Sequence, residues 1–269
     1  MSALSDRDIK RELGKDILIY PFNEDNLKGA SYNLTASKLA WKVQDGKSAY
    51  DSSINKIIIP ANSTVLIQTN EAIWVSKKIA GTYHSKVSWV SQGMGHIGTT
   101  LDPDYKGVSL IAVHNHNNKP IELDPEKDTF VSLMFYYLKT KSSIPHTNDP
   151  GRPDILKLLR QVQLTSDESR WLEESFRKDT ERLRKKLKES DNFKIFKKDW
   201  LDNLRYLLPY IILILLSILS LCFYLYLDAN STVLSQKHWY NTVSSFADRT
   251  TYVMFGALIA LITSDLRRS

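Results

Sequence analysis

The chain contains very little cysteine, since Cys222 is the only one among its 269 residues. A single thiol cannot form an intrachain disulfide or complete a cysteine-based zinc site. An apolar leader is also missing, because Met1–Lys15 is polar and charged where a secretory signal needs an apolar run. We therefore expect the N-terminal part of the chain to lie in the cytoplasm, a reducing compartment.

Several common catalytic signatures are missing too. The sequence contains no Walker phosphate loop, no G-x-S-x-G elbow and no dinucleotide-binding fingerprint. Four histidines lie within the first half of the chain, namely His84, His96, His114 and His116. No carboxylate or cysteine stands at a spacing that would complete a metal site with them. We therefore expect no metal ion held by the protein alone.

The longest hydrophobic run lies near the C-terminus. Residues Tyr206–Leu227 read YLLPYIILILLSILSLCFYLYL, an uncharged run long enough to cross about 30 Å of hydrocarbon at about 1.5 Å per residue. A second run, Tyr252–Thr263, can cross only if it draws in the preceding segment, which carries Asp248 and Arg249. Charges at mid-depth need a partner or water, so these two residues are candidates for a membrane function. We predict a transmembrane hairpin over residues 204–264, with spans at 206–227 and 243–263; an interfacial second helix is the alternative.

Basic residues flank both predicted spans. Such residues are enriched on the cytoplasmic side of membrane proteins. They are Lys194, Lys197, Lys198 and Arg205 before the first span, and Arg267 and Arg268 after the second. We therefore expect a multi-pass protein of an inner or plasma membrane, with both ends in the cytoplasm and the Asp228–Gln236 turn outside.

A charged stretch at residues 165–200 precedes the hairpin and follows a linker at 146–164. Thr165 and Glu168 have capping-box spacing, which predicts the start of a helix. Apolar residues recur near heptad spacing, and Asp179 occupies the missing position; they are Leu172, Phe176, Leu183 and Leu187. The stripe fits a coiled-coil stalk and fits equally an amphipathic helix lying on the N-terminal domain or on the membrane.

Residues 30–140 carry short apolar or alternating runs separated by turn residues at spacings near ten. Their β-branched and aromatic content predicts a mainly β domain over residues 1–145, built as an antiparallel sandwich, jelly roll or barrel. Before these runs, Ser5–Leu13 reads as a short helix capped by Ser5, with Asp6 and Asp8 near its positive end.

Four stretches of this domain occur in a characteristic order. They are SDRDIKREL, GASYNLTAS, KVSWVSQGMGHIGTTLDPDYKGVSLIAVHN and PIELDPEKDTFVSLMFYYL, within Ser5–Leu138. The most specific piece is Gly98–Asn115, which combines an aspartate, a turn, an aromatic residue, a glycine and a strand ending in asparagine. In this order and spacing the sequence resembles the dCTP deaminase and dUTPase superfamily.

The resemblance implies a distorted jelly roll that usually forms trimers, with nucleotide sites where subunits meet. It also implies that Tyr105 packs under the deoxyribose and that the Asp102 loop binds the sugar and the base edge. A ring offers apolar area to a sugar, and a carboxylate accepts a bond from its 3′-hydroxyl. Taken without the resemblance, LDPDYKG also fits a tight turn with Pro103 at a favoured position. The other nucleotide-binding candidates are Lys86, Ser88, Gly98, Gly107 and Asn33.

The sequence departs from the pattern that the resemblance implies. The deaminase glutamate that shuttles protons corresponds to Ala112, which has no proton to transfer. The deaminase arginine, serine and second arginine correspond to Lys86, Val87 and Ser91. In the dUTPase branch the aspartate at Asp102 activates water and Mg²⁺ organises the triphosphate, but a further aspartate of that branch is Asn33 here. The glycine-rich C-terminal arm of that branch is not found in SSIPHTNDPGRPD.

Three functional interpretations follow. The first is a membrane-anchored nucleotide sensor or effector with little or no deamination, for instance in antiviral defence. The second is an active membrane-bound enzyme, a dUTP pyrophosphatase with catalytic Asp102 in preference to a dCTP deaminase. The third is a structural trimeric anchor. The expected partners are a nucleotide, with Mg²⁺ if it is a triphosphate, membrane lipid and further copies of the chain, and no nucleic acid.

Overall fold

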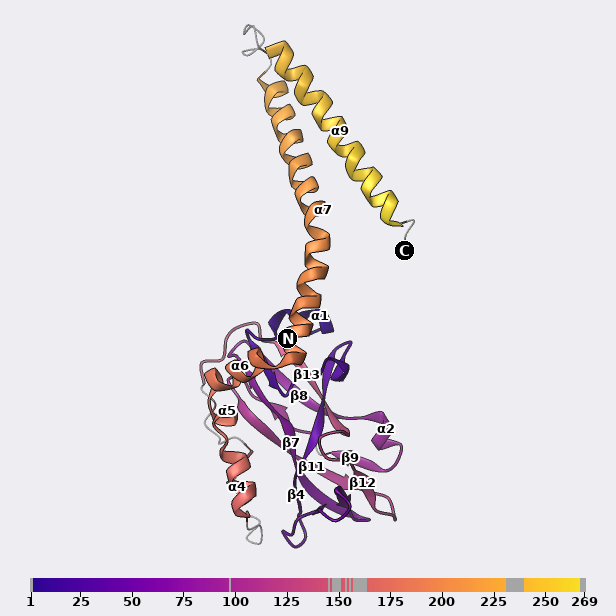
Figure 1. The fold of residues 1–269 in the computed structure, drawn as a ribbon, viewed down its shortest axis with the longest axis vertical. Helices are drawn as coiled ribbons and strands as arrows, with labels where there is room; N and C mark the ends of the chain where they lie inside the picture. The colour runs from indigo at the N-terminus through magenta and orange to yellow at the C-terminus, as the bar shows by residue number, and fades with distance from the viewer. Residues whose placement is uncertain are drawn as a thin grey trace. The chain divides into compact units, whose positions relative to one another are not determined.

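The computed structural model describes residues 2–96, 98–144, 146, 151–152, 154, 156, 164–230 and 240–266 (Figure 1). The chain divides into two compact units, residues 1–196 and 197–269. The first unit contains all the described strands, and the second contains most of helix α7 and helix α9. The boundary between them falls at residue 196, well beyond the predicted domain end at residue 145.

The first unit is built on antiparallel strands. Its main sheet has ten strands, and its central path runs β10-β8-β13-β4-β7-β11-β9. A smaller sheet has the order β12-β6-β5. The prediction of a mainly β N-terminal domain is therefore confirmed. The strand bounds are β1 Ser2–Ala3, β2 Ile17–Tyr20, β3 Leu27–Lys28, β4 Ser31–Lys42, β5 Tyr50–Asp51, β6 Lys56–Ile59, β7 Ser63–Val75, β8 Ile79–Ser85, β9 Met94–His96, β10 Thr100–Leu101, β11 Lys106–Asn115, β12 Ile121–Leu123 and β13 Thr129–Tyr137.

Strand β4 joins two parts of the main sheet. Its first part pairs with β13 and its second part pairs with β7, and both pairings contain a register shift. Such irregularities bend a strand and increase its twist. Large side chains fill the interior that this bending creates, including Tyr32, Trp41 and Phe135, each at most 1% exposed. The core therefore lies inside a strongly bent antiparallel sheet.

Two short helices frame this sheet, and the sequence predicted the first of them from its cap. Helix α1 (Asp6–Glu12) begins after Ser5, whose hydroxyl accepts from the backbone N–H of Asp8 while the Asp8 carboxylate accepts from the backbone N–H of Ser5. This reciprocal capping confirms the predicted N-terminal helix. A 3-10 turn follows at Glu24–Asn26, and helix α2 spans Val87–Val90.

The predicted charged helix is divided into three shorter helices. They are α4 (Ser166–Glu173), α5 (Ser175–Lys178) and α6 (Thr180–Glu189). Asp179 breaks the run because its carboxylate accepts from the backbone N–H groups of Glu181 and Arg182, at 2.8 and 3.1 Å, and so caps α6. The predicted capping box of Thr165 and Glu168 is present at the start of α4.

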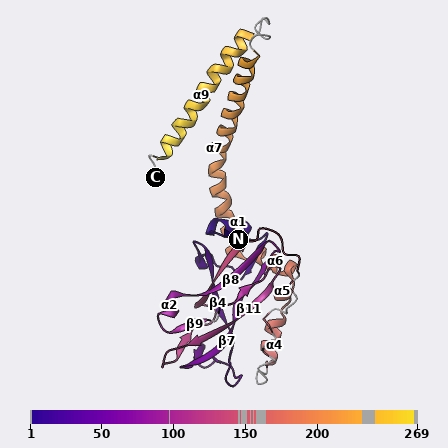
Figure 2. The same ribbon diagram turned by 180° about the vertical axis from the view of Figure 1, so that it is seen from behind.

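These helices lie along one side of the β domain (Figure 2). The apolar stripe that fitted a coiled coil is buried in the same core as the strands; its members are Leu172, Phe176, Leu183 and Leu187. Because these side chains are buried against the sheet, they are not free to form the seam of a coiled coil. Within the described chain, the amphipathic arrangement on the N-terminal domain is therefore the one adopted.

The second unit is helical. Helix α7 (Asp191–Ala229) begins in the first unit, and α9 (Tyr240–Leu266) follows it. Among the described residues, Ile211–Ala229 is the one helical stretch that is long and apolar enough to cross a membrane, with a mean hydropathy of 2.3. This stretch overlaps the first predicted span. The second predicted span lies within α9, and much of it falls outside the residues whose side chains are described, so it stays a prediction. The predicted outer turn lies largely outside the described residues, as do Arg267 and Arg268.

Helices α7 and α9 contact each other through small side chains. The hydroxyls of Ser220 and Thr251 lie 2.8 Å apart, and Ser217 and Ala247 are each 2% exposed. Small and hydroxylated residues allow close approach and hydrogen bonding between helices in an apolar solvent. By contrast, Leu215 and Leu219 on α7 are more than 60% exposed. The second unit therefore pairs a small-residue contact with an exposed apolar face.

Candidate functional site

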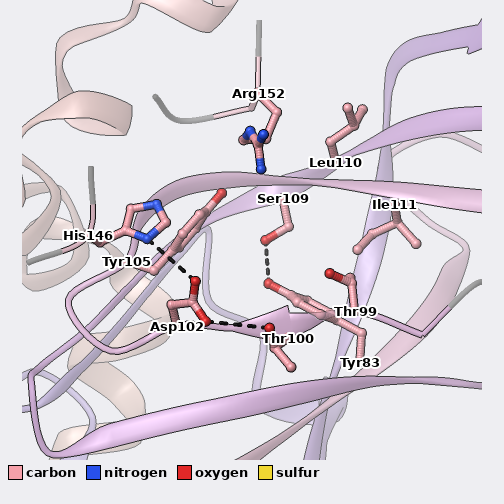
Figure 3. Close-up of a pocket in the computed structure, with 10 residues that line it drawn as sticks. All are labelled: Tyr83, Thr99, Thr100, Asp102, Tyr105, Ser109, Leu110, Ile111, His146 and Arg152. Carbon is pink, nitrogen blue, oxygen red and sulfur yellow. Dashed lines mark hydrogen bonds and ion pairs between the residues drawn. The ribbon is translucent and has the colours of Figure 1, made fainter. Parts of the chain in front are cut away.

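A cavity of about 220 Å³ opens in the first unit near the turn between β10 and β11 (Figure 3). Its walls come from β8, from the β9–β10–β11 connections, from β11 itself and from the segment after β13. Polar groups predominate among the lining residues, which are Tyr83, Thr99, Thr100, Asp102, Tyr105, Ser109, Leu110, Ile111, His146 and Arg152. Two of the predicted ligand contacts, Asp102 and Tyr105, therefore meet at one cavity.

Asp102 presents a carboxylate to this cavity. The chain turns tightly here, because Tyr105 N–H donates to the Asp102 carbonyl at 3.2 Å and Asp104 has a φ of 65°. The Asp102 carboxylate accepts from the Thr100 hydroxyl at 3.4 Å and lies 3.8 Å from Nδ1 of His146. Its side chain is 59% exposed, so it retains the capacity to accept hydrogen bonds from a ligand. The tight turn and the ligand-facing aspartate are thus features of the same loop.

Tyr105 forms a rigid wall of the cavity. Its side chain is buried, and its hydroxyl donates to the carbonyl of Val108. Burial raises the pKa of Tyr105 to about 12, so the phenol remains protonated and keeps this donor role at neutral pH. His146 packs edge-on against the ring, with a centroid distance of 5.0 Å (Figure 3). The ring is therefore held in place from two directions.

A bulge in β11 places a third polar group in the cavity. The register between β11 and β7 shifts between Val108 and Leu110, so Ser109 leaves the regular ladder and its N–H donates to the Thr69 hydroxyl at 2.9 Å. The Ser109 hydroxyl lies 2.5 Å from that of Tyr83, whose pKa is raised by burial. Bulges commonly redirect side chains beside functional sites.

The other predicted contacts do not line this cavity. Lys86 occupies the N-cap position of α2 without a side-chain capping bond, and its ammonium donates to the Thr129 hydroxyl; partial burial lowers the pKa of Lys86. Asn33 is buried and accepts from the Ser132 hydroxyl at 2.6 Å. Ser88 lies within α2, where its carbonyl accepts from the side chain of Gln92 at 2.8 Å.

The predicted glycines have different surroundings. Gly107 has a φ of 122° and is the second residue of β11, two residues after Tyr105, so it supports the turn, whereas Gly98 has no atom within 4 Å of an added Cβ. Ala112 lies on β11 opposite Leu66. No proton-transferring side chain therefore stands at the position where the resemblance implies a glutamate. Asp248 and Arg249 lie on α9, in the second unit.

Two lining residues were not predicted from the sequence. His146 and Arg152 come from the segment after β13, for which the sequence predicted only a linker. The His146 side chain is 8% exposed, and its Nε2 has no hydrogen-bond partner among the described residues. Arg152 forms a bidentate pair with Asp154, at 2.8 and 3.0 Å. Only the presence of a histidine and an arginine soon after the last strand could have indicated them.

Comparison with known proteins gives a consistent relationship for the β domain. The family model described as dCTP deaminase-like matches residues 3–136. The dCTP deaminase of Pyrococcus abyssi is 30% identical over 135 residues, which cover 50% of this chain and 86% of that protein. The dCTP deaminase of Pyrococcus horikoshii is 27% identical over 138 residues, which cover 51% of this chain and 86% of that protein.

The solved structures similar to this chain include a deaminase and a dUTPase. A 2'-deoxycytidine 5'-triphosphate deaminase from Agrobacterium tumefaciens has a TM-score of 0.41 and 12% identity, covering 50% of this chain and 46% of that one. A native EIAV dUTPase has a TM-score of 0.34 and 22% identity, covering 50% of this chain and 93% of that one. His146, Arg152 and the helices from α4 onward lie beyond the residues that the family model matches. Through the matched β domain, and on its sequence relationship to the Pyrococcus enzymes, the chain belongs to the dCTP deaminase-like family.

Proposed function

We propose that this chain is a membrane-anchored nucleotide-binding protein that acts as a sensor or effector and turns its ligand over slowly or not at all. The observation that carries the proposal is the convergence of Asp102 and Tyr105 on one cavity while Ala112 stands at the deaminase glutamate position. An aromatic wall and an exposed carboxylate can bind a deoxyribose, but an alanine cannot relay a proton. Binding is thus retained where deamination chemistry is lost.

The cavity is small for a whole nucleotide. Its volume of about 220 Å³ lies below the range of about 300–1,000 Å³ that is typical of small-molecule sites. One chain therefore supplies room for part of the ligand. This supports assembly with further copies, as in the trimer that the family resemblance implies, with the remainder of each site coming from a neighbour.

Mg²⁺ would accompany a triphosphate ligand. Among the described lining residues, Asp102 is the one carboxylate, and Asn33 is already bound to Ser132. Mg²⁺ in nucleotide sites commonly binds one or two carboxylates together with substrate phosphates. The residues present therefore fit an ion that arrives with the nucleotide and touches the protein at Asp102.

The membrane anchor is proposed as the predicted two-helix hairpin. The apolar stretch Ile211–Ala229 is the first span, and the bond between Ser220 and Thr251 supports a second helix packed beside it. Asp248 and Arg249 lie on that second helix and remain the residues proposed for a membrane function.

Antiviral defence is the proposed setting, since a ligand domain joined to a membrane hairpin suits a response to altered nucleotide pools.

The proposal is tested on the full chain in detergent micelles, mixed with dUTP or dCTP and Mg²⁺. Calorimetry measures binding, and chromatography measures products. We expect binding without product in the wild type and at least tenfold weaker binding in Asp102→Asn. Asp104→Asn is the matched control, because it changes the neighbouring carboxylate of the same turn and asparagine tolerates its φ of 65°. Failure of the wild type to bind any deoxynucleotide would contradict the proposal and leave the structural anchor.

A second candidate is an active dUTP pyrophosphatase. It is favoured by one observation, the 59% exposed carboxylate of Asp102 facing the cavity, where it could activate a water molecule. In the same experiment this candidate predicts release of pyrophosphate from dUTP that disappears in Asp102→Asn and persists in Asp104→Asn.

A further inference from the structure

One backbone carbonyl joins the cavity to the segment that follows the β domain. The carbonyl of Val108, beside the β11 bulge, accepts from the Tyr105 hydroxyl and also from the Gly151 N–H at 3.0 Å. A carbonyl oxygen has two lone pairs and can accept both bonds. The ring that forms a wall of the cavity and a residue beyond the family domain are therefore attached to the same atom.

Gly151 is enclosed on its other sides. The side-chain amide nitrogen of the buried Gln68 donates to the Gly151 carbonyl at 2.5 Å, and the oxygen of the same amide has no partner in the described part of the chain. A Cβ built on Gly151 would lie 3.0 Å from Gln68, 3.1 Å from Leu172 and 3.2 Å from Val108, and its φ is +70°. The positive φ strains any other residue here, and the close neighbours would have to shift to admit a Cβ, so both features favour glycine.

Leu172 connects this contact to the helices. It belongs to α4 and is 7% exposed. The end of α4 is fastened to α5 by Arg177, whose guanidinium lies 3.6 Å from the Trp171 ring centre and donates to the Trp171 carbonyl at 2.8 Å. Glu174 completes this arrangement with an ion pair of 2.6 Å to Arg177. A displacement of Leu172 would therefore move α4 and α5 together.

We infer that Gly151 is a positioning residue that holds Tyr105 in its ligand-binding orientation and links occupation of the cavity to helix α4. The link runs from the Tyr105 hydroxyl through the Val108 carbonyl and Gly151 to Leu172. The ligand-dependent part of this inference rests on the proposed nucleotide binding. The link itself belongs to the ligand-free chain, since the hydrogen bonds named and the closeness of Leu172 to Gly151 are present without a ligand, and coupling between two sites acts in both directions.

The ligand-free arm of the test uses amide hydrogen exchange in the full chain in micelles. Tyr105→Phe removes one bond to Val108, and we expect exchange in residues 166–178 to become about fivefold faster, which is the order expected for losing one net hydrogen bond. Tyr136→Phe is the control, because it removes a hydroxyl that bonds to Thr82 on another part of the sheet. Unchanged exchange in α4 of Tyr105→Phe would overturn the inference.

The ligand arm uses dUTP or dCTP with Mg²⁺, whichever the wild type binds. Gly151→Ala should weaken binding about tenfold because it strains the backbone and displaces Val108, whereas Gly29→Ala, which has open space around it, should bind normally. Leu172→Ala, whose side chain does not line the cavity, should still bind nucleotide but lose the nucleotide-induced change of exchange in α4. Leu187→Ala, which removes another buried leucine of the connecting helices, in α6, should retain that change.

The two arms separate the two proposals. If the wild type binds no nucleotide, the proposed function fails, while the ligand-free arm still decides whether Tyr105 and α4 are linked. If the wild type binds and Gly151→Ala binds equally well, the assignment of Gly151 as a positioning residue fails and the proposed function stands.

Discussion

Glu71 is a carboxylic acid enclosed within strand β7. Its side chain is 2% exposed, and it accepts from the backbone N–H of Thr35 at 3.0 Å while the Thr35 hydroxyl lies 2.8 Å away. Burial raises the pKa of Glu71 to about 7 from its ordinary value of 4.5, because the charged form is poorly solvated there, although the bonds from Thr35 oppose the shift. The folded chain therefore holds this proton more tightly than the unfolded chain does.

The stability of the chain should consequently depend on pH between about 4.5 and 7. A raised pKa in the folded state gives stability that is fully present below about pH 4.5 and is lost as pH rises through about 7, by roughly 3 kcal/mol in total. Glutamine reproduces the protonated acid, so Glu71→Gln should be nearly independent of pH in this range. Urea unfolding followed by circular dichroism measures the effect. Glu122→Gln, at an exposed site, should behave like the wild type, and a flat wild-type profile would contradict the assignment.

At the scale of elements, the connecting helices show how one polar residue redirects an apolar pattern. Asp179 occupies the heptad position where a coiled coil needs an apolar side chain, and it caps α6 instead. The resulting break lets α4, α5 and α6 follow the surface of the β domain and bury Leu183 and Leu187. Burying these side chains against the sheet removes apolar area from water without a second chain.

Leu187→Ala should therefore destabilise the first unit. The side chain is fully buried, and removing it should cost about 2–5 kcal/mol through lost burial and a residual cavity. The loss should not depend on protein concentration, because the leucine packs within its own chain. Unfolding measured at several concentrations tests this expectation. Lys185→Ala, on the exposed face of the same helix, is the control, and a concentration-dependent loss in Leu187→Ala would favour a coiled coil.

At the scale of the whole molecule, a β domain of the dCTP deaminase-like family is joined to a helical unit with a candidate membrane span. The exposed face of that span is apolar, as in Ile218, Leu219 and Phe223, each 47% exposed or more. Exposed apolar surface of this extent needs a partner other than water. Ile211–Ala229 is long and apolar enough to meet this need by crossing a lipid bilayer.

Leu219→Arg should weaken retention of the full chain in membranes. An arginine near the centre of a span costs about 3 kcal/mol. Alkaline extraction of membranes followed by immunodetection measures the retained fraction, which should fall for this variant. Ile195→Arg is matched to it, because Ile195 is 60% exposed on the same helix but lies outside the candidate span. Equal retention of the two variants would argue against Ile211–Ala229 as the anchor.

Local features of this protein could be read from the sequence because they depend on neighbouring residues. Alternating apolar runs predicted the strands, Ser5 and Thr165 predicted helix starts, and an uncharged run predicted the candidate span. The order of motifs indicated the family, and the resemblance predicted Asp102 and Tyr105 as ligand contacts.

Only the tertiary structure decided which distant residues share a site. His146 and Arg152 have no periodic signal, since their place beside Tyr105 depends on how the segment after β13 returns across β11. Lys86 and Asn33 were candidate ligand contacts because of their positions in the family motifs. Their side chains bond to Thr129 and Ser132 instead. The helical stripe was ambiguous for the same reason: an amphipathic pattern specifies that a face is buried, and the fold determines the surface that buries it.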